Sequence, residues 1–167
     1  MSPYFVTALE VVSSLRGTDT RGTILNHWLR HRAELRTLGF QRGFQWLDGS
    51  FVEEKEPNDL DVVTFIRRPS AAADLAGFST LIKSNARLFM RPSVKDGFML
   101  DAFFVDLGGA PETIVNVSRY YLGLFSHRRG DHLWKGMLQV GFEDPSDDEA
   151  ALIALASPAR PRSGANH

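Results

Sequence analysis

WLDGSFVEEKEPNDLDVVTF, residues 46–65, holds the start of the strongest β-strand pattern in the chain. The strand itself is predicted over residues 60–66, a short apolar run that contains several β-branched residues. Two aspartates, Asp59 and Asp61, lie at the beginning of this run. Moving an unpaired charge from water into an apolar interior is costly, so both carboxylates need a compensating partner.

Helices and strands are predicted on both sides of this run. Apolar periodicity, turn residues and terminal signals indicate the order helix, strand, strand, helix, strand, helix, strand, helix. The elements cover residues 20–40, 43–47, 60–66, 70–90, 97–107, 111–125, 133–142 and 145–157. Gly77 predicts an interruption of the second helix. This order is typical of an α/β or α+β fold built on a small mixed sheet.

The composition predicts one globular unit. The chain has 167 residues, of which 43% are hydrophobic and 11% aromatic, and this content is ample for a core. We find no repeat and no interdomain linker, so a single domain is expected over residues 1–157. The remaining segment, 158–167, is rich in Pro, Arg and Ser and is expected to be disordered.

Charge and cysteine content exclude several classes of function. The formal net charge of -1 predicts no strong nonspecific binding of nucleic acid, although a nucleotide-sized ligand fits this balance. The absence of cysteine excludes disulfides, a thiolate nucleophile and zinc sites built on sulfur. Neither a secretory leader nor an apolar stretch long enough to cross a membrane is found, so we expect a cytoplasmic protein that does not bind membranes.

The two aspartates at the start of the strand are expected to share a cation. Side chains alternate along a strand, so Asp59 and Asp61 face the same way and repel each other unless a positive charge lies between them. Mg²⁺ suits carboxylate oxygens, with phosphates completing its shell. A third carboxylate is expected from the strand at 97–107. Asp101 is preferred because it lies near the beginning of that strand, and Asp106 is the alternative.

Three other features have less specific interpretations. A solvated turn before an ordinary strand is the alternative interpretation of Asp59 and Asp61 themselves, because a lone D-x-D pattern is a weak signal. Asp48 is interpreted as a cap of the turn that follows it. His27 and His31 have a spacing that can bind zinc, but they lack the Glu of the H-E-x-x-H motif and are expected to be partly exposed helix residues.

Two motifs together carry a family resemblance. LDGS at residues 47–50 is followed after eight residues by DLDVV at 59–63, and MLDAF contains the later acid Asp101. This pattern resembles the signature of the DNA polymerase β-like nucleotidyltransferase superfamily. The resemblance covers residues 43–107 and is closest to small stand-alone bacterial members, in which W-x-D-G-S-F and P-N-D-x-D-V-V recur before a later K-G strand, here at Lys135.

The resemblance implies a short mixed sheet flanked by helices and a metal-dependent transfer of a nucleotide. Asp59, Asp61 and Asp101 are implied metal ligands and catalytic residues, with Mg²⁺ or Mn²⁺ as the cofactor and a nucleoside triphosphate as the substrate. Asp59 and Asp61 would bridge two ions about 4 Å apart. Asp101 would hold the catalytic ion and help the acceptor to lose its proton.

The phosphates of the nucleotide have their own predicted partners. Gly49 lets the backbone approach a phosphate closely, and the amides of Gly49 and Ser50 and the Ser50 hydroxyl can donate to its oxygens. Lys55 and Lys135 are the preferred basic partners. The wider set of basic candidates is Lys55, Lys83, Lys95, Arg128, Arg129 and Lys135.

The acceptor of the nucleotide is not specified by the sequence. A protein, an RNA end and a small molecule all remain open. The chain shows no large helical domain of the kind that binds a second substrate in better-known members of the superfamily. A nucleotide-binding or protein-binding module with weak or no turnover, such as an antitoxin-like or regulatory partner of another protein, is therefore the alternative function.

Overall fold

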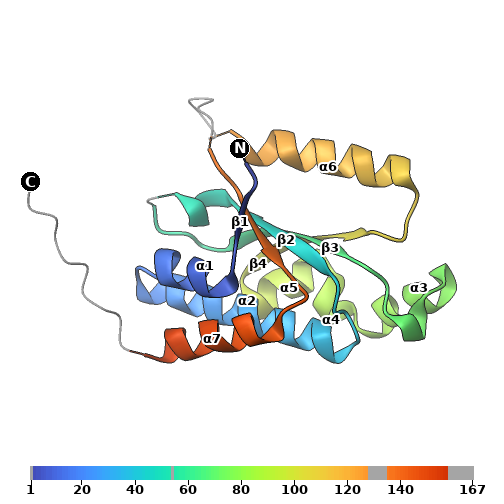
Figure 1. Ribbon diagram of the computed structural model, residues 1–167, viewed down its shortest axis with the longest axis horizontal. Coiled ribbons are helices and arrows are strands. Elements are labelled where there is room, and N and C mark those ends of the chain that lie inside the picture. The colour runs from blue at the N-terminus through green and yellow to red at the C-terminus, as the bar shows by residue number, and fades with distance from the viewer. Residues whose placement is uncertain (1, 54, 128–134, 158–167) are drawn as a thin grey trace, which may run out of the picture.

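Five strands of the described residues form one mixed sheet, and helices lie on both of its faces (Figure 1). The structure is a computed structural model that describes residues 2–53, 55–127 and 135–157. The strands are β1 (Tyr4–Val6), β2 (Gly43–Asp48), β3 (Leu60–Ile66), β4 (Leu100–Asp106) and β5 (Leu138–Gly141). The helices are α1 (Ala8–Leu15), α2 (Asp19–Thr37), α3 (Leu75–Ser84), α4 (Ala86–Phe89), α5 (Arg91–Phe98), α6 (Pro111–Phe125) and α7 (Pro145–Ala156). Two short 3-10 turns are η1 (Gly49–Val52) and η2 (Ser70–Ala72).

The sheet combines parallel and antiparallel pairs in the order β1-β5-β2-β3-β4. β2 runs antiparallel to both of its neighbours, β3 and β5, whereas β3 pairs with β4 and β1 pairs with β5 in parallel. The beginnings of β3 and β4 therefore meet the end of β2 at one end of the sheet. This arrangement confirms the predicted α/β class with a mixed sheet.

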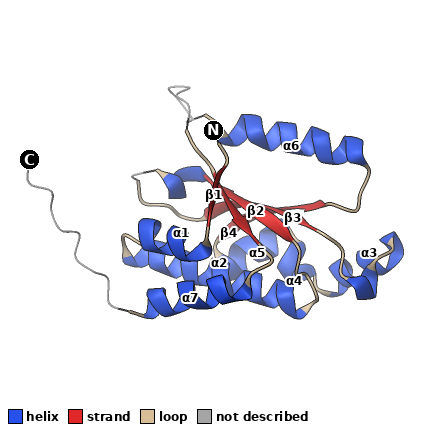
Figure 2. Cartoon of the chain, viewed as in Figure 1, coloured by secondary structure: helices blue, strands red, loops and turns tan. Residues whose placement is uncertain are grey.

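The larger core lies between the sheet and the helices α1, α2, α4, α5 and α7, which Figure 2 shows below the strands. Leu60 and Val62 of β3 point into this core, as the alternation of the strand predicts. Trp28 of α2 is fully buried in the same cluster. The helices thus cover one face of the sheet almost completely, and polar side chains on that face need internal partners.

The smaller core lies on the opposite face under α6. Val63 and Phe65 of β3 pack there against Tyr121 and Phe125 of α6. Residues of β3 with odd numbers, which include Asp61, therefore face α6. Since Asp61 is two residues before Val63, it lies at the edge of this smaller core, where the sheet ends.

Local signals explain where most helices begin. Thr7 and Glu10 form a capping box at the start of α1, with each side chain bound to the other residue's backbone amide. Thr18 caps α2 by accepting from the Arg21 amide. Pro111 occupies the first turn of α6, as predicted, because its missing amide hydrogen is not needed there.

Within the described residues, no helix combines the length and the apolar character needed to cross a membrane.

The structure corrects several predicted boundaries. The second predicted helix is not broken at Gly77, which lies in the first turn of α3, but at Asn85, after which α4 and α5 follow. The last strand begins at Leu138 and is shorter than the predicted 133–142, part of which lies outside the described residues. β1 and α1 were not predicted. The C-terminal tail, 158–167, also lies outside the described residues.

His31 is a core residue and not the partly exposed helix residue that its sequence position predicts. Its side chain is fully buried and packs edge-on against Phe98. Nε2 lies 2.9 Å from the carbonyl oxygen of Leu88, to which it donates when it carries the ring hydrogen. Nδ1 has no hydrogen-bond partner within the described part of the chain. Burial lowers the pKa of His31 to about 4, because a second N–H would be unsatisfied in this apolar site.

This burial predicts that acid destabilises the fold through His31. The unfolded chain takes up a proton near the ordinary pKa of 6.5, whereas the folded protein resists protonation until about pH 4. Stability is therefore fully present above pH 6.5 and is lost as the pH falls from 6.5 to 4, by up to about 3 kcal/mol. His31→Gln keeps a donor for Leu88 and removes this term. In urea unfolding, we expect the free energy of unfolding of the wild-type protein to fall relative to that of the variant as the pH decreases from 6.5 to 4. A difference between the two proteins that does not change with pH would contradict this role of His31.

Candidate functional site

Three aspartates form a row across the end of the sheet. Asp48, the last residue of β2, is paired in register with Asp61 of β3, and Asp61 is paired in register with Asp101 of β4. Residues paired in this way point to the same face, which is the face under α6. The predicted meeting of Asp61 and Asp101 is therefore a property of the strand register. We call Asp48, Asp59, Asp61 and Asp101 the carboxylate cluster.

Asp59 completes the carboxylate cluster at its outer side. It immediately precedes β3 and lies two residues before Asp61, so it lies on the same face of the extended chain as Asp61. The alternative third acid, Asp106, is paired in register with Ile66 at the far end of β4 and is bound to Arg68. The structure thus places Asp101, and not Asp106, beside Asp61.

The Gly-Ser turn closes directly over the cluster. Gly49 has a φ of +79°, a conformation that favours glycine, and it begins η1. A Cβ atom at this position would lie 1.7 Å from Oδ2 of Asp61, so no other residue fits without displacing that carboxylate. Ser50 follows in η1, and its side chain lies outside the described part of the structure. Gly49 therefore lets the turn touch the carboxylate row.

A buried arginine of α2 holds the segment that follows the turn. Arg21 donates to the carbonyl oxygens of Phe51 at 2.6 Å, Glu53 at 2.6 Å and Lys55 at 2.8 Å. Its guanidinium also lies over the ring of Phe51, with 5.0 Å to the ring centroid. These contacts fix the backbone next to the Gly-Ser turn through charge-assisted hydrogen bonds. The larger core thereby supports the position of the turn.

The two preferred lysines lie on the same side of the cluster as the turn. Lys135 Nζ lies 2.9 Å from Oδ2 of Asp48 and 3.4 Å from Oε1 of Glu53, and its side chain is mostly buried. Lys55 is exposed and pairs with the other oxygen of Glu53 at 3.4 Å. Glu53 therefore joins Lys55 to Lys135, which contacts Asp48 directly. Arg128 and Arg129, which belong to the wider set of basic candidates, lie outside the described residues.

Two basic residues of α5 approach the opposite side of the cluster. Arg91 binds Asp101 through two hydrogen bonds, one of them from Nη2 at 2.7 Å, and Lys95 Nζ lies 2.7 Å from Oδ2 of Asp59. These contacts raise the pKa of each cation. Met99 ends α5 in a left-handed conformation and leads straight into β4, which holds the helix beside the start of that strand.

Asp48 is the most buried acid of the cluster. It is 2% exposed, and this burial raises the pKa of its carboxyl to about 6, with a further increase from the charge of Asp61. The Gly49 amide and Lys135 act in the opposite direction. Oδ2 meets Lys135, but Oδ1 has no hydrogen bond of good geometry to any described residue. Such a buried oxygen is an acceptor that a ligand can satisfy.

The cluster has the donors for a divalent cation, but Asp48, Asp59 and Asp101 contact basic side chains. Among the described residues, no three His, Asp or Glu side chains converge on one point that would hold an ion. The backbone positions nevertheless fit such a site, since neighbouring strands carry the acids in register and Asp48 Oδ1 has no hydrogen-bond partner in the part of the chain that the structure describes. All-oxygen ligands of this kind suit Mg²⁺ and Mn²⁺.

Sequence reasoning missed Asp48 and Arg91 as members of the site. Asp48 was interpreted only as a cap, because its place in the row depends on the antiparallel register with Asp61. Arg91 lies ten residues before Asp101, and no predicted element brings it to that acid. Its spacing of four from Lys95 was the available signal, because residues four apart share one face of a helix.

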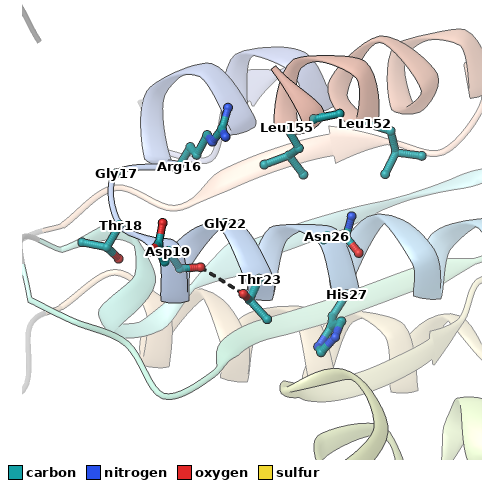
Figure 3. Close-up of a pocket in the computed structure, with 11 residues that line it drawn as sticks. Arg16, Gly17, Thr18, Asp19, Gly22, Thr23, Asn26, His27, Leu152 and Leu155 are labelled. Carbon is teal, nitrogen blue, oxygen red and sulfur yellow. Dashed lines mark hydrogen bonds between the residues drawn. The ribbon is translucent and has the colours of Figure 1, made fainter. Parts of the chain in front are cut away.

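One cavity lies away from the carboxylate cluster. It has a volume of about 480 Å³ and lies between the start of α2 and the end of α7. Figure 3 shows Leu152 and Leu155 of α7 on one side of it and Thr23 and Asn26 of α2 on the other. Among the described residues that line it, none belongs to the carboxylate cluster. A second cavity, of about 650 Å³, borders the segment after the Gly-Ser turn, where Val52, Glu53 and Glu56 line it together with Arg21.

Comparison with known proteins identifies a family but no characterised relative. No curated protein and no solved structure matches the chain. A family profile described as "Family of unknown function (DUF6932)" matches residues 2–141, a range that includes all five strands and the whole carboxylate cluster. Because this match covers most of the sequence, the chain belongs to the DUF6932 family of unknown function.

Proposed function

We propose that the protein is a metal-dependent nucleotidyltransferase that transfers a nucleoside monophosphate from a nucleoside triphosphate to an acceptor hydroxyl. One observation carries the proposal. The Gly-Ser turn meets a carboxylate of the D-x-D pair, as the 1.7 Å approach of a Cβ at Gly49 to Asp61 demonstrates, and Asp101 lies beside that carboxylate in register. The motif spacing predicts such a juxtaposition of turn and acids, and a site for metal and phosphate requires it.

The proposed reaction is a single displacement at the α-phosphorus. The acceptor oxygen forms a bond to that phosphorus, the bond from the phosphorus to the bridging oxygen breaks, and pyrophosphate leaves. Asp101 accepts the proton of the acceptor hydroxyl in this scheme. Asp59, Asp61 and Asp101 hold Mg²⁺ or Mn²⁺, which when bound supplies positive charge against the phosphate oxygens.

The triphosphate is proposed to lie on the side of the Gly-Ser turn. The amides of Gly49 and Ser50 hold the outer phosphates, because backbone amides in such a turn favour anions. Lys55 and Lys135 add positive charge on this side. An ammonium group has three donors, and Lys135 directs two of them at Asp48 and Glu53 among the described residues, which leaves a third for a phosphate oxygen.

A second function, a nucleotide-binding or protein-binding module with little or no turnover, also has a specific observation in its favour. Arg91 and Lys95 already neutralise Asp101 and Asp59. A site whose acids are compensated by its own cations is stable without chemistry. In that case the fold binds a nucleotide or a protein partner, in the manner of an antitoxin-like or regulatory subunit, and the carboxylates serve recognition.

Calorimetry tests the proposed nucleotide site. We expect a non-hydrolysable ATP analogue to bind the wild-type protein in the presence of Mg²⁺ and to lose at least about tenfold in affinity when Mg²⁺ is omitted. In the Asp59→Ala/Asp61→Ala double variant this dependence on Mg²⁺ should disappear, because the metal ligands are gone. Asp106→Ala removes an aspartate at the far end of β4 and should leave the binding unchanged. Equal metal-dependent binding in the double variant and the wild type would reject the site.

A further inference from the structure

The ion pairs around the carboxylate cluster are of two kinds. Lys135 and Asp48 form a buried pair, with side chains that are 13% and 3% exposed. Arg91 and Lys95 are different, because their side chains are 55% and 53% exposed while the acids they contact are much less exposed. An exposed cation is readily hydrated when it leaves its partner, whereas the less exposed acid needs a new positive charge in its place. Arg91 and Lys95 are therefore the exchangeable partners of the cluster.

Both exchangeable cations come from one face of one helix. Arg91 and Lys95 lie four residues apart on α5, so their side chains project side by side. β4 is the edge strand of the sheet, and α5 contacts its beginning, so these side chains reach past the sheet edge to the face under α6. Arg91 lies over the ring of Phe103 on that face, with 4.6 Å to the centroid. Two adjacent cations at this spacing match an anion that carries more than one charge.

A separate observation points to a ligand at the cluster. Asp48, which is 2% exposed, keeps Oδ1 without a well-formed hydrogen bond among the described residues, next to Asp61 in the register of the sheet. A buried acceptor of this kind costs free energy unless something satisfies it. Asp48 lies at the buried end of the row of acids, whereas Arg91 and Lys95 contact Asp101 and Asp59 at the more exposed end. A cation bound among the carboxylates would satisfy this oxygen and compete with the two basic side chains.

We infer that Arg91 and Lys95 are exchangeable counter-ions: they neutralise Asp101 and Asp59 in the structure described here, and they exchange these acids for the phosphate groups of a bound metal–nucleotide complex. The inference rests on the proposed function and deepens it, because it assigns Arg91, which sequence reasoning overlooked, to the nucleotide. It also explains why no three acids of the described residues converge on one point. Positive charge stays balanced throughout, since each cation gains an anionic partner as it leaves another.

If Arg91 and Lys95 exchange partners in this way, removing either of them should change the affinity for metal and the affinity for nucleotide in opposite directions. Lys95→Gln removes a competitor of the metal, so binding of Mn²⁺ alone should become about two- to fivefold tighter, as measured by the electron paramagnetic resonance signal of free Mn²⁺ at constant ionic strength. The same variant removes a phosphate partner, so binding of a non-hydrolysable ATP analogue with Mn²⁺ should become about tenfold weaker. Arg91→Gln should show the same pair of changes.

A control variant separates the exchange of partners from a general effect of net charge. Arg30→Gln removes an exposed arginine of α2, which packs on the face of the sheet opposite α6, with the same change of net charge, and it should alter neither binding constant by more than about twofold. If Lys95→Gln and Arg91→Gln weaken both kinds of binding, or change neither, the exchange is wrong while the proposed function stands. If the wild-type protein binds no Mn²⁺ at all, the proposed function fails, and the exchange fails with it.

Discussion

Replacing Asp148 with alanine is expected to lower the free energy of unfolding by about 3–5 kcal/mol, the largest stability effect that a single ion-pair residue of the described structure should produce. Asp148 of α7 is buried and accepts from Arg32 Nε at 2.7 Å and from its Nη2 at 2.9 Å. Arg36 also donates to this carboxylate. Removing the carboxylate leaves the fully buried guanidinium of Arg32 without its counter-ion, in a site that lowers its pKa through desolvation.

The rest of the network around Arg32 cannot replace that charge. Arg32 also donates to Gln45 Oε1 at 2.9 Å and to the carbonyl oxygen of Gly141 at 2.6 Å. Trp28 Nε1 donates to the same Gln45 oxygen at 2.8 Å, and Gln45 donates to Thr64 at 3.0 Å. These partners are neutral, so they satisfy hydrogen bonds but do not balance the positive charge. The network joins α2 to three strands and α7, and its loss should loosen the whole larger core.

Urea unfolding followed by circular dichroism measures this effect, and two further variants sharpen it. Glu34→Ala breaks the exposed pair with Arg87 and should cost no more than about 1 kcal/mol. Arg32→Met combined with Asp148→Leu replaces both charges with apolar groups and should be more stable than Asp148→Ala alone. A cost for Asp148→Ala as small as that of Glu34→Ala would show that Arg32 is not the buried, paired charge described above.

The parts of the fold with strong local signals could be predicted from the sequence. The apolar run of β3 has the predicted bounds, 60–66, and Pro111 and the apolar spacing behind it give α6 the predicted bounds, 111–125. α1 was missed although its capping box, Thr7 with Glu10 three residues later, was a readable signal. β1 offered no such signal, because a strand of three residues exists only through its pairing with β5.

The candidate site was predictable only in part, for a related reason. Asp59, Asp61 and Gly49 are close in sequence, and their spacing alone indicates a turn that returns to the next strand. Asp101 could be placed by its position in its own strand. Asp48, by contrast, enters the site through antiparallel pairing, and Arg91 enters it through the path of α5. Long-range pairing of this kind is decided by packing and not by local propensity.

The buried polar residues show the same limit more clearly. Arg32 and Asp148 are far apart in the chain, and each looks in the sequence like a surface charge on a helix. Their burial follows from the packing of α7 on α2, which leaves both side chains between helix and sheet. Periodicity could not reveal this pair, because charged residues are normally placed on the solvent side of an amphipathic helix.

Replacing Asp61 with asparagine is expected to lower the proposed nucleotidyl transfer by about a thousandfold or more, while leaving the fold intact. Asparagine keeps the size of the side chain and its place between Asp48 and Asp101, but it removes the negative charge on which the proposed metal binding depends. The same change relieves repulsion in the row, since the charge of Asp61 raises the pKa of Asp48. The unfolding free energy should therefore stay within about 1 kcal/mol of the wild-type value.

The assay for this activity follows the transfer of label from each α-labelled nucleoside triphosphate. Each reaction contains Mg²⁺ or Mn²⁺ and a cell lysate as the source of the acceptor. Asp106→Asn makes the same substitution at the far end of β4, where the side chain is bound to Arg68, and should retain transfer. Transfer that persists in Asp61→Asn would exclude the carboxylate cluster as its source. Absence of transfer in the wild-type protein, together with metal-dependent binding of the nucleotide, would favour the binding module, because the acids would then recognise the metal–nucleotide complex without breaking the bond at its α-phosphorus.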